Sequence, residues 1–146
     1  MYHFNQIIFS EDSFGITQKS LEILRDALAN SLRQNIAVVQ VDTNDLCCGF
    51  FIFNPALGIA TWTGDGFRTD RGGEGGAGYK SAEALIGLFG LRITISDVRL
   101  DEQISRILSI GNHEEIEAAL RALAKEVAGG LINEDFRCAG NPQYVR

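Results

Sequence analysis

The residues best suited to chemistry lie in one glycine-rich segment. Seven of the 16 glycines fall in the fifteen residues from Gly64 to Gly78. Glycine permits positive φ and close approach of the backbone, so successive N–H groups can converge on an anion. Basic and aromatic side chains in the same segment could complete a phosphate or nucleotide site. The candidate ligand-binding residues are Gly64, Asp65, Gly66, Phe67, Arg68, Thr69, Arg71, Gly75, Gly78, Tyr79, Lys80 and Ser81.

This segment joins an expected strand at 59–63 to an expected helix at 79–89. A helix start offers unpaired N–H groups and the positive end of the helix dipole, and both favour anions. We expect the N–H groups of the helix start, the charges of the basic residues and the aromatic rings to act together. These groups belong to Tyr79, Lys80 and Ser81 (N–H groups), Arg68, Arg71 and Lys80 (charge), and Phe67 or Tyr79 (stacking). The alternatives are a surface loop without a ligand and a tight backbone crossing at an oligomer contact.

Two known phosphate-binding motifs match the segment only in part. Residues 73–78 read G-x-G-x-x-G, and Asp97 follows at the distance typical of a ribose-binding carboxylate. That motif should directly follow a strand, whereas about ten residues separate it from Thr63. The P-loop pattern fails because Tyr79 stands as an extra residue between Gly78 and Lys80. We therefore predict neither a dinucleotide-binding fold nor a P-loop ATPase.

A second candidate site consists of carboxylates. Asp42 ends an expected strand, Glu83 lies in the following helix, and Asp97 ends the next strand. This β-β-β-α-β order over about 36–97 resembles the ribonuclease-H-like fold. The resemblance implies that the three carboxylates hold two Mg²⁺ ions for phosphodiester cleavage. The alternative interpretation is structural, with strand-end and turn residues and a solvated helix position.

Composition limits the classes of partner. The net charge is −6, from 13 basic and 19 acidic residues, and most basic residues stand near a carboxylate in the sequence. This disfavours nucleic acid, whose binding depends on basic patches, but leaves room for one small anion. No apolar stretch reaches membrane-spanning length and no signal peptide is recognisable, so we expect a cytoplasmic protein without a membrane partner. Three cysteines and two histidines provide neither a disulfide framework nor a zinc motif.

Periodicity along the chain predicts a single α+β domain covering residues 1–146. We expect an antiparallel meander at about 36–63, further strands at 4–10 and 91–96, and an N-terminal helix capped by Thr17. A helix follows the glycine-rich segment, and two more helices, starting near Asp101 and at Asn112, close the chain. Residues 131–146 show no clear period.

These features favour a protein that binds a small anionic molecule, a nucleotide or phosphate ligand. We expect it to bind, sense or sequester this ligand rather than to convert it chemically. No general base has adequate support, so enzymatic activity and any cofactor are left open. Enclosure of a ligand on a 16.0 kDa subunit favours a homo-oligomer. One alternative is a Mg²⁺-dependent ribonuclease-H-like phosphodiesterase using Asp42, Glu83 and Asp97. The other is a structural or assembly protein whose glycine-rich segment is an oligomer contact.

Overall fold

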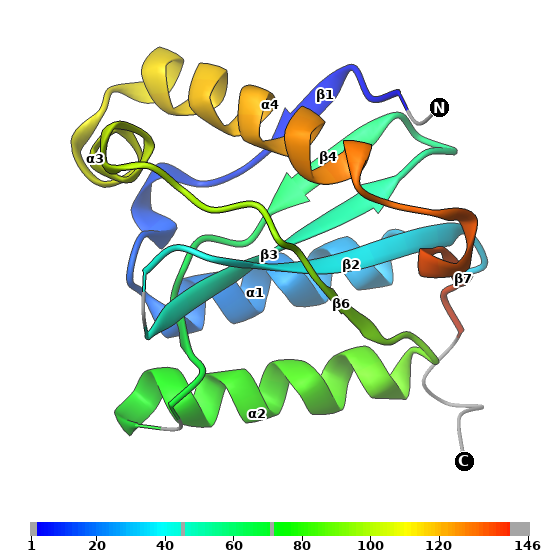
Figure 1. Ribbon diagram of the computed structural model, residues 1–146. Helices are drawn as coiled ribbons and strands as arrows, with labels where there is room; N and C mark the ends of the chain where they lie inside the picture. The colour runs from blue at the N-terminus through cyan, green and yellow to red at the C-terminus, as the bar shows by residue number, and fades with distance from the viewer. Residues whose placement is uncertain (1–2, 45, 71, 141–146) are drawn as a thin grey trace.

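The computed structural model describes residues 3–44, 46–70 and 72–140. Within these ranges, a mixed sheet of seven strands is covered by helices on both faces (Figure 1). The helices are α1 (Thr17–Ala29), α2 (Gly73–Leu88), α3 (Glu102–Ile110) and α4 (His113–Gly129), with short 3₁₀ turns η1 (Glu11–Ser13) and η2 (Asn133–Asp135). The strands are β1 (Gln6–Ile8), β2 (Asn35–Asp42), β3 (Cys47–Asn54), β4 (Ile59–Trp62), β5 (Phe67–Arg68), β6 (Ile93–Ile95) and β7 (Arg137–Cys138).

The sheet has the order β1-β4-β3-β2-β6, with β5 pairing to β3 and β7 to β2. Strands β2, β3 and β4 form the antiparallel meander that the sequence predicts, with Ala37 opposite Phe53 and Phe51 opposite Trp62. The first strand, β1, pairs with β4 in parallel, and β6, which follows α2, pairs with β2 in parallel. The predicted α+β fold is therefore confirmed.

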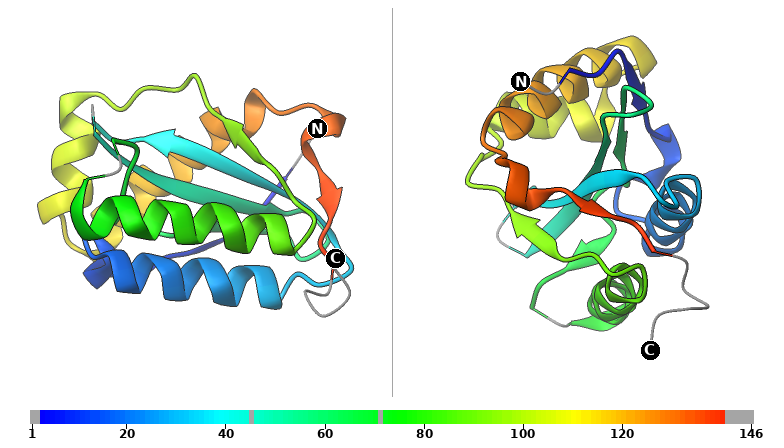
Figure 2. Two further views of the ribbon diagram at one scale, coloured as in Figure 1. Left: turned by 90° about the horizontal axis from the view of Figure 1, so that it is seen from below. Right: turned by 90° about the vertical axis from the view of Figure 1, so that its right-hand side faces the viewer.

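Two apolar cores fill the faces of the sheet, because alternate residues of a strand point to opposite sides. Val38, Phe50 and Ile52 pack with α1 and α2 on one face, while Val39 and Phe51 pack with α3 and α4 on the other. Figure 2 shows the helix pairs on opposite sides of the sheet. Strand β3 is buried on both faces, as its apolar run predicts.

The C-terminal helices begin where their capping residues predict. The Asp101 side chain accepts a hydrogen bond from the N–H of Ile104, and Asn112 forms a capping box with Glu115. The apolar stripe of α4, which includes Leu120 and Leu123, faces the sheet. No helix among the described residues is long and apolar enough to cross a membrane.

Several boundaries differ from the sequence-based expectation. Helix α2 begins at Gly73 rather than at Tyr79, so the glycine-rich segment is half loop and half helix. Thr17 is the first residue of α1 and makes no capping bond; its hydroxyl donates instead to the carbonyl oxygen of Gly66 at 2.6 Å. The two-residue strands β5 and β7 are additional elements, and residues 141–146 lie outside the described residues.

Candidate functional site

The structure divides the glycine-rich segment into a buried loop and the first turns of α2. Residues 63–67 are buried beneath η1 and the start of α1. A Cβ at Gly64 would lie 2.5 Å from Ser13 Oγ, and a Cβ at Gly66 would lie 2.7 Å from the backbone of Ile16. In α2, a Cβ at Gly78 would overlap the methyl group of Thr17. These glycines therefore allow close packing between α1, the β4–β5 connection and α2.

Asp65 is a buried carboxylate with a structural set of partners. It is 6% exposed and accepts hydrogen bonds from the Gly15 N–H at 2.7 Å and the Thr43 hydroxyl at 3.2 Å. Burial raises the pKa of Asp65, while the hydrogen bonds from Gly15 and Thr43 act in the opposite direction. The carboxylate thereby connects the η1–α1 loop to the β2–β3 hairpin, and it does not point to an anion.

The cation next to this loop is already paired. Arg68 donates through Nε and Nη2 to the two carboxylate oxygens of Asp70, at 3.0 and 2.6 Å. The Gly72 N–H also donates to Asp70, and together these bonds lower the pKa of Asp70 to about 2. A Cβ at Gly75 would press on the Arg68 side chain at 2.7 Å. Arg71, the other cation proposed here, lies outside the described residues.

The aromatic residues of the segment also have partners. Phe67 is fully buried, and its ring centroid lies 5.3 Å from that of Phe50, so the ring is not available for stacking on a ligand. The Tyr79 hydroxyl donates to Gln40 Oε1 at 2.6 Å. Burial, with the nearby charge of Glu83, raises the pKa of Tyr79 to about 12.

The prediction that the helix starts at Tyr79 and binds an anion there is wrong in its position, because α2 begins at Gly73. Tyr79, Lys80 and Ser81 lie in the second and third turns of α2, where backbone N–H groups belong to the helix. Lys80 and Ser81 are exposed, as is Thr69, whose N–H donates to the carbonyl oxygen of Leu46. The G-x-G-x-x-G match lies within the helix, not in a strand-to-helix turn.

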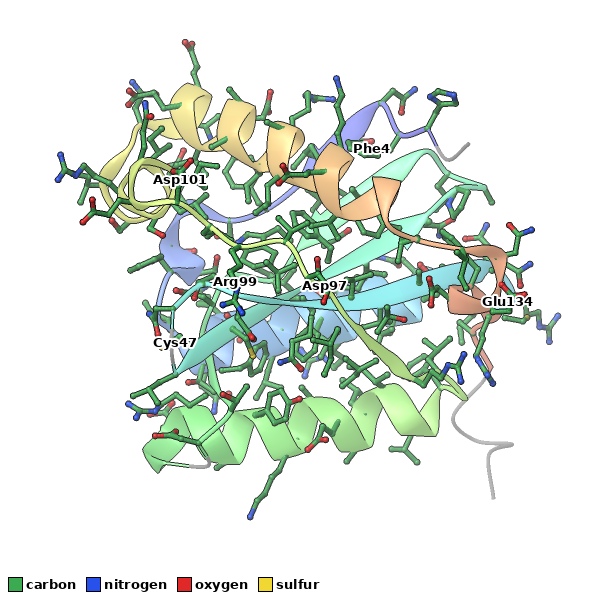
Figure 3. All side chains as sticks on the ribbon, viewed as in Figure 1. Phe4, Cys47, Asp97, Arg99, Asp101 and Glu134 are labelled. Carbon is green, nitrogen blue, oxygen red and sulfur yellow. The ribbon has the colours of Figure 1, made fainter. Side chains whose placement is uncertain are left out.

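The three carboxylates of the alternative metal site are not brought together. Asp42, Glu83 and Asp97 are all exposed, and Asp42 accepts a hydrogen bond from Gln40 Nε2 at 3.1 Å. Figure 3 shows Asp97 on the extended segment that follows β6. Among the residues that the structure describes, no group of three His, Cys, Asp or Glu side chains could hold a metal ion. The predicted two-metal arrangement is therefore not formed.

A different site lies at the end of the molecule where β2 begins and α4 ends. An open pocket of about 1280 Å³ is formed there by four segments of the chain. The right-hand view of Figure 2 faces this end, with the end of α4, η2 and the start of β2 around it. We call it the basic pocket; it is lined by His3, Phe4, Arg33, Gln34, Asn35, Pro55, Ala56, Lys125, Ala128, Gly129, Leu131, Ile132, Asn133 and Phe136.

The charge of the basic pocket is opposite to that of the chain. Its lining holds His3, Arg33 and Lys125 and, among the described residues, no Asp or Glu. Arg33 and Lys125 are exposed, and neither forms an ion pair with any residue that the structure describes. Their charges are therefore not neutralised by a neighbour, unlike that of Arg68.

Arg33 is held at the rim by an uncommon backbone conformation. Its φ is +66°, a value that residues other than glycine seldom adopt. The Arg33 N–H donates to the Ala139 carbonyl oxygen at 2.7 Å, and the Ala139 N–H donates to the Gln34 carbonyl oxygen at 3.0 Å. The segment after β7 thus fixes the turn that carries Arg33.

A buried amide connects two of the segments that line the pocket, the turn before β2 and the β3–β4 turn. Asn54, 3% exposed, donates through Nδ2 to Gln34 Oε1 at 2.7 Å and to Ser31 Oγ at 3.0 Å. Its Oδ1 accepts from the Leu57 N–H of the β3–β4 turn at 3.2 Å. Because Asn54 occupies the oxygen of the Gln34 amide, the NH₂ group is the part of that amide left for the pocket.

Sequence reasoning missed this pocket because its residues come from distant positions and form no motif. The nearest signal was the polar run from Arg33 to Asn35 between a helix and a strand. Comparison of the chain with models of protein families, with curated proteins and with solved structures gives no match.

Proposed function

We propose that this protein binds an anionic molecule with an apolar part, and that the basic pocket is the binding site. The ligand class expected from the sequence, a small anion that is bound rather than turned over, is kept, while the site moves away from residues 64–81. The observation that supports it is the charge of the lining: two cationic side chains, Arg33 and Lys125, and, among the described residues, no acidic side chain, in a chain of net charge −6.

The chemistry of the lining supports an amphipathic anion. Phe4, Leu131, Ile132 and Phe136 offer apolar surface, and Arg33 and Lys125 offer charge at its edge. Binding sites of this kind combine apolar walls with a few polar groups that fix orientation. Phosphate alone would use the charge but none of the apolar surface, so it should bind more weakly than a ligand with both parts.

Thermal shift and calorimetric titration with four probes test this function. We use decanoate, decyltrimethylammonium, AMP and inorganic phosphate. Decanoate should stabilise the protein, and decyltrimethylammonium, with the same chain and the opposite charge, should not. A ligand at 100 times its Kd stabilises by about 2.7 kcal/mol, which a melting curve resolves. AMP tests the nucleotide-like ligand directly.

Two lysines provide a matched pair of variants. Lys125 lines the pocket on α4, whereas Lys80 is exposed on α2 in the segment favoured by the sequence. Lys125→Glu should weaken decanoate on the order of fivefold, because an attraction of roughly 0.5 kcal/mol between exposed charges becomes an equal repulsion, a change of about 1 kcal/mol. Lys80→Glu should leave the affinity unchanged. If Lys80→Glu weakens binding and Lys125→Glu does not, the site is in the glycine-rich segment. If none of the probes stabilises the protein, the proposed function is contradicted.

The expected homo-oligomer stays a prediction. Native mass spectrometry of the purified protein reads the number of subunits and any ligand retained through purification in one measurement. A retained anion whose loss accompanies Lys125→Glu would support the proposed function.

A further inference from the structure

We infer that the ligand of the basic pocket is an extended acidic segment of another polypeptide. This inference rests on the proposed function and names the class of its ligand. It begins from size: at about 1280 Å³ the pocket exceeds the roughly 300–1,000 Å³ of sites for single small molecules. It is also open and is bordered by four chain segments, which suits a ligand that enters and leaves along its length.

The polar groups of the pocket match a peptide backbone. Gln34, Asn35 and Asn133 contribute side-chain amides; Asn35 and Asn133 each offer a donor and an acceptor end, and Gln34 offers its NH₂ group. Every peptide unit offers one N–H and one C=O, so amides can pair with it in both directions. A fatty carboxylate or an inorganic anion has no N–H to offer the acceptor ends.

Apolar side chains stand exposed in the pocket and beside it. Ile132 in the lining is 60% exposed, and Leu57, in the same turn as Pro55 and Ala56, is 48% exposed. Large apolar groups gathered and exposed beside a polar rim are typical of surfaces that bind other molecules. Phe4, labelled in Figure 3, and Phe136 supply aromatic surface from two further segments.

The charges decide the kind of polypeptide. Arg33 and Lys125 favour Asp or Glu side chains in the ligand and disfavour Lys or Arg. The carboxylates nearest in sequence, Glu126, Glu134 (labelled in Figure 3) and Asp135, are not part of the lining. Asp135 accepts the Ile132 N–H at 2.8 Å and the Thr94 hydroxyl at 3.3 Å. Nucleic acid is the competing polyanion, and a pI near 4.8 opposes it.

Fluorescence anisotropy on the full chain tests the inference. The probe is a labelled octapeptide that alternates Glu with Leu and Phe; its counterparts replace each Glu by Lys or are a labelled single-stranded DNA octamer. The acidic peptide should bind about tenfold more tightly than the Lys peptide, and decanoate should displace it. Lys125→Glu should weaken the acidic peptide about tenfold, and Lys80→Glu should not.

A second pair of variants distinguishes a peptide from a simple anion. Asn35→Ala should weaken the acidic peptide about threefold more than it weakens decanoate, because only the peptide can use both ends of the amide. Asn30→Ala, an exposed amide at the end of α1 outside the lining, is the control for both ligands. Circular dichroism confirms that each variant is folded.

The outcomes separate this inference from the function on which it rests. Decanoate binding without peptide binding overturns the inference and keeps the proposed function. Binding of neither overturns both. Equal affinity for the acidic and Lys peptides, or tighter binding of the DNA octamer, overturns the acidic-polypeptide assignment alone.

Discussion

The methyl group of Thr17 occupies the space that a Cβ at Gly78 would need, so the start of α1 and the second turn of α2 are in direct contact. Gly78→Ala should destabilise the protein by about 1–3 kcal/mol through overpacking. Thr17→Ser removes the methyl group and keeps a hydroxyl for the Gly66 carbonyl oxygen. In the Thr17→Ser background Gly78→Ala should destabilise the protein much less. The clashing methyl group is then absent, and alanine favours the helix more than glycine does. Urea unfolding of the four proteins gives the coupling energy; additive effects would contradict the contact.

Gly87 provides the control for this cycle within the same helix. A Cβ at Gly87 would meet no atom within 4 Å. Gly87→Ala should therefore stabilise the protein by about 0.5–1 kcal/mol, the difference in helix propensity alone. If Gly78→Ala lowers the free energy of unfolding and Gly87→Ala raises it, the packing effect is distinguished from helix propensity. Destabilisation by both substitutions would show that glycine is needed along α2 for another reason.

The hydrogen bond from Gly15 to Asp65 leads to a prediction about pH. Because burial raises the folded-state pKa of Asp65, the folded protein holds this proton more tightly than the unfolded chain. The stability from Asp65 is therefore fully present below its ordinary value of 3.8 and is lost as pH rises through the raised pKa. Asp65→Asn keeps an oxygen for Gly15 and does not ionise.

The free energy of unfolding of the wild type minus that of Asp65→Asn should thus decrease as pH rises upward from 3.8. Denaturant titrations at closely spaced pH values measure this difference, in which the effects of the other carboxylates largely cancel. A difference that is constant, or that increases with pH, would show that the hydrogen bonds to Asp65 outweigh its desolvation.

The sequence predicts the meander, the flanking helices and the capped C-terminal helices because each carries a local signal. Alternating or continuous apolar runs mark β2, β3 and β4, and Asp101 and Asn112 mark helix starts. The start of α2 could not be predicted in this way, since four of the six residues from Gly73 to Gly78 are glycine, which has the lowest helix propensity apart from proline. Its helical state depends on contacts with Thr17 and Arg68 that form only in the folded chain.

The dependence on contacts of the folded chain also explains why the sequence predicts a site at residues 64–81 and not at the basic pocket. Glycines that permit close approach to an anion equally permit close approach to a helix, and at Gly66 the neighbour is the backbone of Ile16. The sequence alone does not distinguish the two uses. Arg33 and Lys125 stand far apart in the chain, so their common pocket depends on the meeting of α4 with the start of β2.

Thiol reactivity tests the burial of β3. Burial, followed by the charge of Asp42, raises the pKa of Cys48 to about 12, so Cys48 stays protonated at pH 8 and is also inaccessible. Cys138 is exposed on β7 and Cys47 is half-buried. Iodoacetamide at pH 8 should modify Cys138 first and Cys48 only after unfolding, as read by mass spectrometry of peptides. Cys138→Ser should remove the fastest phase; rapid native modification of Cys48 would contradict the packing.

The bond from Asn54 to Gln34 predicts how the pocket presents its amide. Asn54→Asp keeps an acceptor for the Leu57 N–H but replaces the donor to Gln34 Oε1 by a second acceptor. The Gln34 amide should then turn its NH₂ group toward the new carboxylate and its oxygen toward the pocket. Decanoate affinity should fall about threefold to tenfold, and stability should fall by about 1–3 kcal/mol because a charge is buried.

Asn30→Asp, at an exposed position outside the pocket, is the matched control and should leave decanoate affinity unchanged. Titrations at low temperature keep the Asn54→Asp variant folded, and the side-chain NH₂ resonances of Gln34 in ¹⁵N spectra report the turn of its amide directly. A shifted Gln34 resonance with unchanged decanoate affinity would place the ligand away from Gln34. An unshifted resonance in a folded variant would instead show that Asn54 does not set the orientation of this amide.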